Sequence, residues 1–148
     1  MSSINALAAQ RRRARHFALQ GLYQWSMTQA NLAEIEAEFR IDNDFSHVDG
    51  EYYRALLTGV VSDACELDSS FEQLLDRTLD ELDPIERSLL RLGTFELKER
   101  IDVPYKVVIN ESVALAKKFG ATDSYRYING VLDKVARNYR QIEINAEA

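Results

Sequence analysis

The strongest structural signal in this chain is carried by two stretches, Asp102-Val103-Pro104-Tyr105-Lys106-Val107-Val108-Ile109-Asn110-Glu111 and Tyr127-Ile128-Asn129-Gly130-Val131-Leu132-Asp133-Lys134. The first predicts a helix start, because the ring of Pro104 fixes a helical φ and the first turn has no use for its missing amide proton. The second predicts a closing helix. Between them, Phe119-Gly120-Ala121-Thr122-Asp123-Ser124 places a glycine stop before a polar cap. We therefore expect two helices to meet at a tight exposed corner, which can present backbone amides to phosphate.

Outward from this corner, apolar residues recur three and four positions apart along almost the whole chain, which predicts an all-α fold. The first helix is predicted to bury one continuous stripe and to show arginine and tyrosine on a neighbouring stripe. The stripe expected in the core contains Ala14, Phe17, Ala18, Gly21, Leu22 and Trp25. The neighbouring stripe contains Arg12, Arg15, His16, Leu19 and Tyr23.

The remaining spacing predicts a short helix from Leu32 to about Phe39, a long central helix over about 49–75, and another helix to about Arg100. The last of these begins where Asp83, Pro84 and Glu86 supply a cap, a first-turn proline and a capping-box glutamate. We expect one domain over residues 1–148, made of two antiparallel bundles, 1 to about 80 and 83–140, packed together through the long helix. Residues 141–148 lose apolar periodicity and are expected to fray.

The net charge of −6 conceals a segregation along the chain. Residues 1–30 carry four arginines and no acid, whereas residues 31–90 carry 16 acids and four arginines. A basic N-terminal stretch on an acidic body suits two partners of opposite charge.

Several functions are excluded by what the sequence lacks. No apolar run approaches the roughly 18 residues that a membrane span needs, and the N-terminus does not resemble a secretion signal. Cys65 is the single cysteine and predicts a reducing, cytoplasmic location; it lies beside Val61 and Ala64, so we expect it to pack rather than to react. With two histidines, His16 and His47, and no metal-ligand spacing or phosphate loop, we expect neither an enzyme nor a metal or cofactor site.

The N-terminal part of the chain contains Arg11-Arg12-Arg13-Ala14-Arg15 and then Ala18-Leu19-Gln20-Gly21-Leu22-Tyr23. Together with the two C-terminal stretches, this segment resembles the NusB transcription antitermination family over roughly residues 10–140. The resemblance implies a purely helical, non-enzymatic factor that binds the boxA element of nascent RNA together with NusE, a ribosomal protein. It also implies that the complex is carried by RNA polymerase and counters premature termination, mainly in ribosomal RNA operons.

Single-stranded RNA is held by cations along its phosphates and by rings that stack on its bases. By position in the family pattern, we expect the RNA-binding residues to form one strip: Arg11, Arg12, Arg13, Arg15, Gly120, Asp123, Ser124, Arg126 and Tyr127. Family members often have phenylalanine where Tyr127 stands, which keeps the ring.

The role of Asp123 is open, because its carboxylate can cap the last helix, accept a hydrogen bond from a base edge, or weaken binding by repelling phosphate. Tyr125 and Ile128 are expected in the core. The motif residues Asn110, Glu111 and Asn129-Gly130 either bind a ligand or act structurally, through buried polar bridges or a close helix contact at Gly130.

For the protein partner, Tyr23, Glu81 and Glu86 resemble the surface that family members offer to NusE. An acidic surface is complementary in charge to a basic ribosomal protein. Glu86 has an alternative, purely local role in its capping box. Three other hypotheses remain: the RNA-targeting domain of ribosomal RNA cytosine methyltransferases, although we expect no catalytic domain here; a helical adaptor that binds only protein; and a homodimer that hides the arginine strip.

Overall fold

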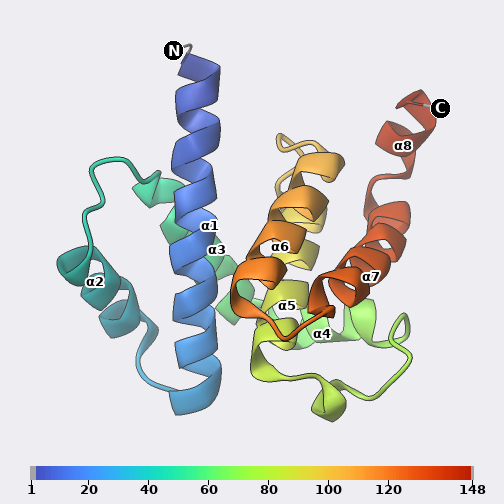
Figure 1. Ribbon diagram of the computed structural model, residues 1–148, viewed down its shortest axis with the longest axis horizontal. Coiled ribbons are helices and arrows are strands. Elements are labelled where there is room, and N and C mark those ends of the chain that lie inside the picture. Colours follow the sequence, from blue (N-terminus) through green and yellow to red (C-terminus); the bar gives the residue numbers. More distant parts are fainter. Residues whose placement is uncertain (1–2, 148) are drawn as a thin grey trace. The chain divides into compact units, whose positions relative to one another are not determined.

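The computed structural model describes residues 3–147, which form helices and no strand, so the predicted all-α fold is confirmed. The chain divides into two compact units, Met1–Ser62 (unit 1) and Asp63–Ala148 (unit 2). Figure 1 shows their helices, which are α1 (Ser3–Thr28), α2 (Leu32–Asp42), α3 (Gly50–Ser62), α4 (Ala64–Glu72), α5 (Pro84–Glu99), α6 (Tyr105–Phe119), α7 (Ser124–Tyr139) and α8 (Gln141–Glu147), with a short 3-10 helix η1 (Leu79–Glu81). None of the described helices is long and apolar enough to cross a bilayer.

Unit 1 is built around α1, which packs against α3 and α2. Gly21 allows this close packing, because a Cβ atom there would lie 2.9 Å from Leu57 Cδ2 and 3.4 Å from Ile35 Cγ2. The predicted core stripe is confirmed at Ala14, Ala18 and Leu22, which are buried.

The expected neighbouring stripe of α1 is only partly correct. Tyr23 is exposed, but Leu19 and Arg15 are buried. Both residues lie next to the core stripe on the helical wheel, so α1 is buried over a wider arc than one stripe. A side chain at the edge of such an arc cannot be assigned to core or surface from its spacing alone.

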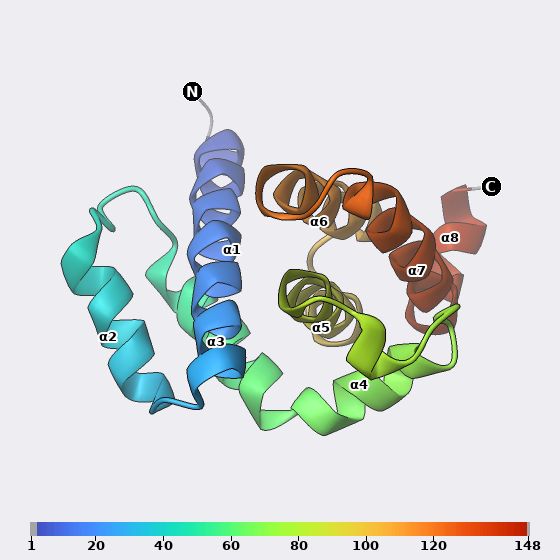
Figure 2. The ribbon, with the colours of Figure 1, turned by 60° about the horizontal axis from the view of Figure 1, so that its bottom comes forward.

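Unit 2 is centred on α5, which packs against α6, α7 and α4 (Figure 2). Its side chains are buried at nearly every position from Ser88 to Leu97. At Gly93 a Cβ atom would lie 2.7 Å from Leu132 Cδ1, so this glycine sets the close approach of α5 and α7. At the start of α5, Asp83 Oδ1 accepts from the Glu86 amide at 2.8 Å, and Glu86 Oε1 accepts from the Asp83 amide at 3.2 Å, as the sequence predicts.

The predicted long central helix is wrong, because the chain is interrupted at Asp63, with φ −108° and ψ 17°, between α3 and α4. The boundary of the two units falls at the same place rather than near residue 80. Aspartate is a poor helix former, since its short side chain competes for the backbone. An interruption of one residue hardly shifts the apolar phase, so periodicity alone does not reveal it. In α4, Cys65 is exposed, and the expectation that it packs is also wrong.

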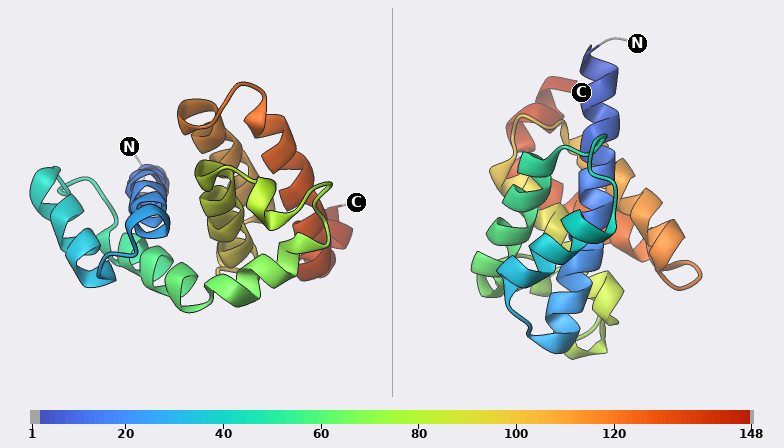
Figure 3. Two further views of the ribbon diagram at one scale, coloured as in Figure 1. Left: turned by 90° about the horizontal axis from the view of Figure 1, so that it is seen from below. Right: turned by 90° about the vertical axis from the view of Figure 1, so that its left-hand side faces the viewer.

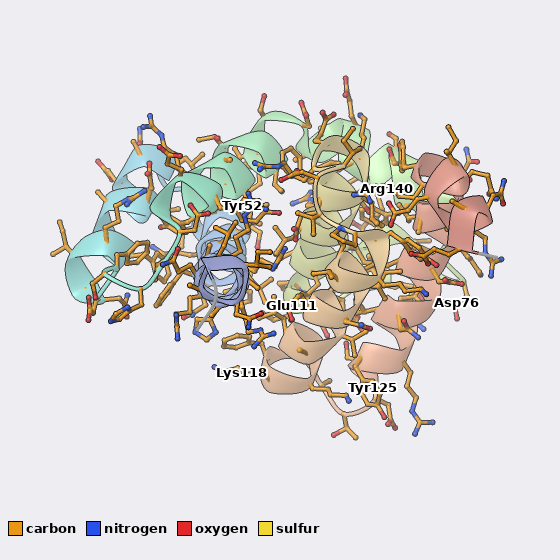
Figure 4. The ribbon with its side chains drawn as sticks, turned by 90° about the horizontal axis from the view of Figure 1, so that it is seen from above. Tyr52, Asp76, Glu111, Lys118, Tyr125 and Arg140 are labelled. Atoms are coloured by element: carbon orange, nitrogen blue, oxygen red, sulfur yellow. The ribbon has the colours of Figure 1, made fainter. Side chains whose placement is uncertain are left out.

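Residues 141–147, which were expected to fray, form helix α8, and buried Arg140 lies where α7 ends and α8 begins (Figure 4). Its guanidinium donates to Glu143 Oε1 at 2.7 Å, and Glu143 Oε2 accepts from the Tyr105 amide at 2.8 Å. It also donates at 2.7–3.1 Å to four carbonyl oxygens that follow or end α5, those of Glu96, Leu97, Arg100 and Val103. The carbonyls of Glu96 and Arg100 also accept from backbone amides, so within the described residues Arg140 supplies the donor that the Leu97 and Val103 carbonyls otherwise lack at the end of the helix.

Candidate nucleic-acid interface

The four arginines of α1 that were predicted to bind RNA differ in how exposed they are. Arg12 and Arg13 are exposed, Arg11 is half-buried, and only 3% of Arg15 is accessible. Two of the four arginines that were expected to bind RNA are therefore exposed. Arg13 Nη1 donates to the His47 carbonyl at 3.0 Å, so part of its hydrogen-bonding capacity is already used inside unit 1.

The other two arginines lie against a buried ring. The guanidinium carbons of Arg11 and Arg15 are 4.4 Å and 5.4 Å from the centroid of Tyr52. Arg11 Nε also lies 3.5 Å from Asp49 Oδ2. The Tyr52 ring and the Asp49 carboxylate thus hold the side chains of Arg11 and Arg15 against unit 1, whereas those of Arg12 and Arg13 are exposed.

In unit 2, the corner between α6 and α7 is as tight as the sequence predicts, but its geometry differs. Gly120 has an extended backbone, with φ −87° and ψ 172°. Glycine is therefore not needed here for a left-handed conformation. A Cβ atom at Gly120 would lie 2.7 Å from the Ala116 carbonyl oxygen, and this close approach excludes a side chain.

The left-handed residue of the corner is Asp123, with φ 67° and ψ 0°. Its side chain makes no capping hydrogen bond, so the capping role is wrong. The exposed carboxylate instead lies 3.8 Å from Arg126 Nε. The other two roles, a contact to a base edge and repulsion of phosphate, stay open.

Ser124 and Glu86 were predicted to contact different partners, but the structure joins them. The Ser124 hydroxyl donates to Glu86 Oε2 at 2.9 Å, and both side chains are buried. With its other carboxylate oxygen in the capping box of α5, Glu86 links the starts of α5 and α7. This hydrogen bond fixes the corner to the helix beneath it.

Tyr127 lies under a guanidinium that the sequence analysis did not single out. The guanidinium carbon of Arg77 is 4.0 Å from the ring centroid. Burial, together with the nearby Asp76 carboxylate, raises the pKa of the Tyr127 phenol. The segment that carries Asp76 and Arg77 returns from α4 past α7 to the start of α5 (Figure 3, left).

Further residues at the corner were also missed. Tyr125, expected in the core, is half-buried at the corner (Figure 4). Two cations lie close to its ring, with Lys117 Nζ at 4.8 Å and the Arg126 guanidinium carbon at 5.7 Å from its centroid, and Arg126 Nε donates to its hydroxyl at 3.1 Å. The pair Lys117–Lys118 in the last turn of α6 was the available signal, since two lysines precede the corner directly.

The remaining motif residues are mostly at the surface. Asn110, Asn129 and Gly130 are exposed, and Glu111 is half-buried. A Cβ atom at Gly130 would meet nothing within 4 Å, so the close helix contact expected there is wrong.

The residues predicted for the protein partner lie in both units. Tyr23 is 37% exposed, at the C-terminal half of α1. Glu81 is exposed in η1, where its Oε1 accepts from the Thr78 amide at 2.9 Å and from the Thr78 hydroxyl at 3.0 Å. These hydrogen bonds lower the pKa of the Glu81 carboxyl, which is therefore ionised at neutral pH.

Metal chemistry finds no support in the described part of the chain, where no three His, Cys, Asp or Glu side chains gather to hold an ion. The arrangement instead offers exposed cations and half-buried rings. Such groups contact the phosphates and bases of a nucleic acid.

Comparison with known proteins gives consistent results. The profile of the NusB family matches residues 12–137. The chain is 58% identical over 140 residues to the transcription antitermination protein NusB of Teredinibacter turnerae, covering 94% of this chain and 95% of that protein. Among solved structures, T. maritima NusB is 28% identical and superposes with a TM-score of 0.78, covering 87% of this chain and 92% of the other. A structure of the antitermination factors NusB and NusE with dsRNA is 30% identical, with a TM-score of 0.71 and coverages of 86% and 96%.

Proposed function

Because the chain belongs to the NusB family, we propose that it is a transcription antitermination factor that binds boxA-type single-stranded RNA together with NusE. The observation that carries this proposal is the similarity of this chain to the transcription antitermination protein NusB of Teredinibacter turnerae, which extends over nearly the whole length of both proteins. A related protein of 30% identity has been solved with NusE and dsRNA, which supports both partners.

In unit 1, we propose that Arg12 and Arg13 contact the RNA, because they are the exposed cations of the arginine run. Arg11 and Arg15 stay predicted contacts, with their guanidinium groups held on Tyr52. Cations of this kind bind phosphates without reading the base sequence.

In unit 2, the proposed RNA contacts are at the corner: Gly120, Asp123, Arg126 and Tyr127. The bare backbone of Gly120 lets a ligand approach closely. Ser124 acts through its hydrogen bond to Glu86, because its buried hydroxyl is already engaged. That the segments of the two units form one strip remains a prediction.

The decisive experiment is binding of a labelled boxA-containing RNA and of a scrambled control, with and without NusE, across a salt series. We expect tighter and sequence-selective binding with NusE. Equal, weak binding to both RNAs would contradict the proposal and favour a helical adaptor that binds only protein. Phosphate contacts release counterions, so affinity falls with salt by about 0.7 in logarithmic slope for each contact to a single strand.

Matched variants localise the contacts. Arg12→Gln with Arg13→Gln should lower both the affinity and the salt slope, because two exposed cations are removed. Arg54→Gln is the control, since Arg54 is an exposed arginine of the same unit outside the predicted strip. An equal loss in the control would mean that only overall charge matters.

For the NusE surface, we propose that Tyr23 and Glu81 make contact and that Glu86 positions the corner from within. Tyr23→Ala should weaken NusE binding several-fold and leave binding of RNA alone unchanged. Tyr139→Ala is the matched control, because both tyrosines are 37% exposed. Unchanged NusE binding by the Tyr23 variant would remove this residue from the surface.

At the level of the cell, we propose that the complex joins RNA polymerase in the cytoplasm and mainly supports transcription of ribosomal RNA. A non-enzymatic role fits this assembly. Sedimentation of the protein alone, with and without RNA, tests the homodimer hypothesis: a dimer that separates on RNA addition would show that the arginine strip is hidden in the free protein.

A further inference from the structure

Arg77 occupies a position that the proposed contact set does not include. It lies in the connection between α4 and η1, and its guanidinium carbon is 4.0 Å from the centroid of the Tyr127 ring. That distance places the cation against the ring as in a cation–π pair. Any ligand that reaches the Tyr127 ring from this side meets Arg77 first.

Asp76 holds this guanidinium without covering its faces. Arg77 Nε donates to Asp76 Oδ1 at 2.7 Å and Nη2 donates to Oδ2 at 3.4 Å. These two hydrogen bonds use one edge of the guanidinium, in its plane. The carboxylate therefore fixes the orientation of the plane, while the ring of Tyr127 supports one face.

The rest of the Arg77 head group remains available. Its side chain is 34% exposed, and within residues 3–147 no acceptor is bonded to Nη1. Below it, the Tyr127 hydroxyl oxygen is buried and has no hydrogen-bond partner in the described part of the chain, so the inner edge of this half-buried ring faces the interior of unit 2. Arg77 thus presents a planar cation, oriented by Asp76, over a half-buried ring.

Given the proposed RNA-binding function, on which this inference rests, we propose that Arg77 and Tyr127 form one composite stacking platform for a nucleobase of the RNA. The base lies on the outer face of the Arg77 guanidinium, and the Tyr127 ring supports the inner face. Guanidinium planes stack on unpaired bases as aromatic rings do. The ion pair with Asp76 offsets much of the charge of Arg77, so stacking rather than phosphate attraction is its main contribution.

The test separates planarity from charge with the variant Arg77→Lys, which keeps the charge and loses the plane. Binding of the labelled boxA-containing RNA is measured across the salt series. We expect an affinity loss of about five- to tenfold, within the range for removal of a single base stack, with an unchanged salt slope. Arg100→Lys is the matched control, because Arg100 is 27% exposed and pairs with Asp102 through the same two nitrogens. It precedes α6 rather than the corner.

A double-mutant cycle tests whether the two residues act as one platform. In a Tyr127→Leu background, the further change Arg77→Lys should cost less than twofold, since the supporting ring has already been removed. Circular dichroism of each variant checks that it is folded. A full, additive loss in that background would overturn the composite platform.

The two proposals fail in different ways. If the unaltered protein shows no selective RNA binding, the proposed function fails and the platform fails with it. If the unaltered protein binds selectively and Arg77→Lys binds equally well, the platform alone is overturned. If Arg77→Gln lowers the salt slope while Arg77→Lys keeps both the slope and the affinity, Arg77 is a phosphate contact and the stacking role is wrong.

Discussion

At the scale of single residues, Asp123 combines a left-handed backbone with a carboxylate that caps nothing. We predict that Asp123→Asn tightens RNA binding about two- to fivefold, as expected for removing one exposed charge from the phosphate path. Folding should be unaffected within about 0.5 kcal/mol, because asparagine tolerates the left-handed region and no cap is lost.

The measurement is RNA affinity at fixed salt, together with urea unfolding. Asp133→Asn serves as the control, since Asp133 is a surface carboxylate of the same helix that pairs with Arg137. Weaker RNA binding by the Asp123 variant, with unchanged unfolding, would mean that the carboxylate accepts a hydrogen bond from a base.

Arg140 is the residue on which the C-terminal part of unit 2 depends most. Arg140→Met should lower the free energy of unfolding by about 3 kcal/mol, because it leaves the carbonyl oxygens of Leu97 and Val103 without a donor. The free energy of unfolding of Arg140→Lys should lie between those of Arg140→Met and the unaltered protein, since an ammonium group has three donors rather than five. Urea unfolding gives the values, and Arg137→Met, at an exposed site, should change them by less than about 0.5 kcal/mol. Equal effects at both positions would show that water replaces Arg140.

Neither Arg140 nor Arg77 could have been found from the sequence. The carbonyl acceptors of Arg140 lie 37 to 44 residues earlier in the chain, and Tyr127 lies 50 positions after Arg77. Arginine is mostly a surface residue, so its type gives no indication of burial. Arg15 shows the opposite error. Its place in a basic run predicted a surface position, but the packing of α1 buries it.

At the scale of helices, two glycines predict opposite outcomes. Gly130→Ala should raise the free energy of unfolding by about 0.5–1 kcal/mol, because the position is an exposed helix interior with open space around it. Gly93→Ala should lower it by at least about 1 kcal/mol, since the added methyl group would collide with Leu132. Thermal unfolding of both variants is the measurement. A loss of stability at Gly130 would indicate a contact that the open space around it does not show.

Helix ends were predictable where their signals are local. Asp83, Pro84 and Glu86 lie within four residues, and the capping box forms as expected. The second role of Glu86, its hydrogen bond to Ser124, connects residues 38 positions apart and leaves no trace in either motif. The interruption at Asp63 escaped for a different reason, since the apolar spacing is nearly the same on both sides of it.

At the scale of the whole molecule, acid sensitivity should depend on the buried carboxylate of Asp68. Burial alone would raise its pKa, but hydrogen bonds from Arg91 and Arg87 outweigh it and lower the pKa. A carboxyl with a lowered folded-state pKa contributes stability above its unfolded value of about 3.9, and this contribution is lost as the pH falls toward the folded value.

Asp68→Asn should therefore cost about 2–3 kcal/mol at pH 7, because two arginines lose a shared partner. It should also flatten the decline in stability below about pH 4. Urea unfolding from pH 7 to pH 3 tests this, with Asp133→Asn as the surface control. Parallel pH profiles for Asp68→Asn and the unaltered protein would contradict the assignment.

The reach of Arg140 also bears on the order in which the protein takes shape while it is being made. The residues whose carbonyl oxygens it binds are synthesised 37 to 44 residues before it. At typical rates of synthesis, about 5–20 residues per second, they remain without this partner for roughly 2–9 seconds. The turn that leads from α5 into α6 is thus completed only after the whole of α7 has been synthesised, so the central helix of unit 2 is made well before the residue that fixes its end.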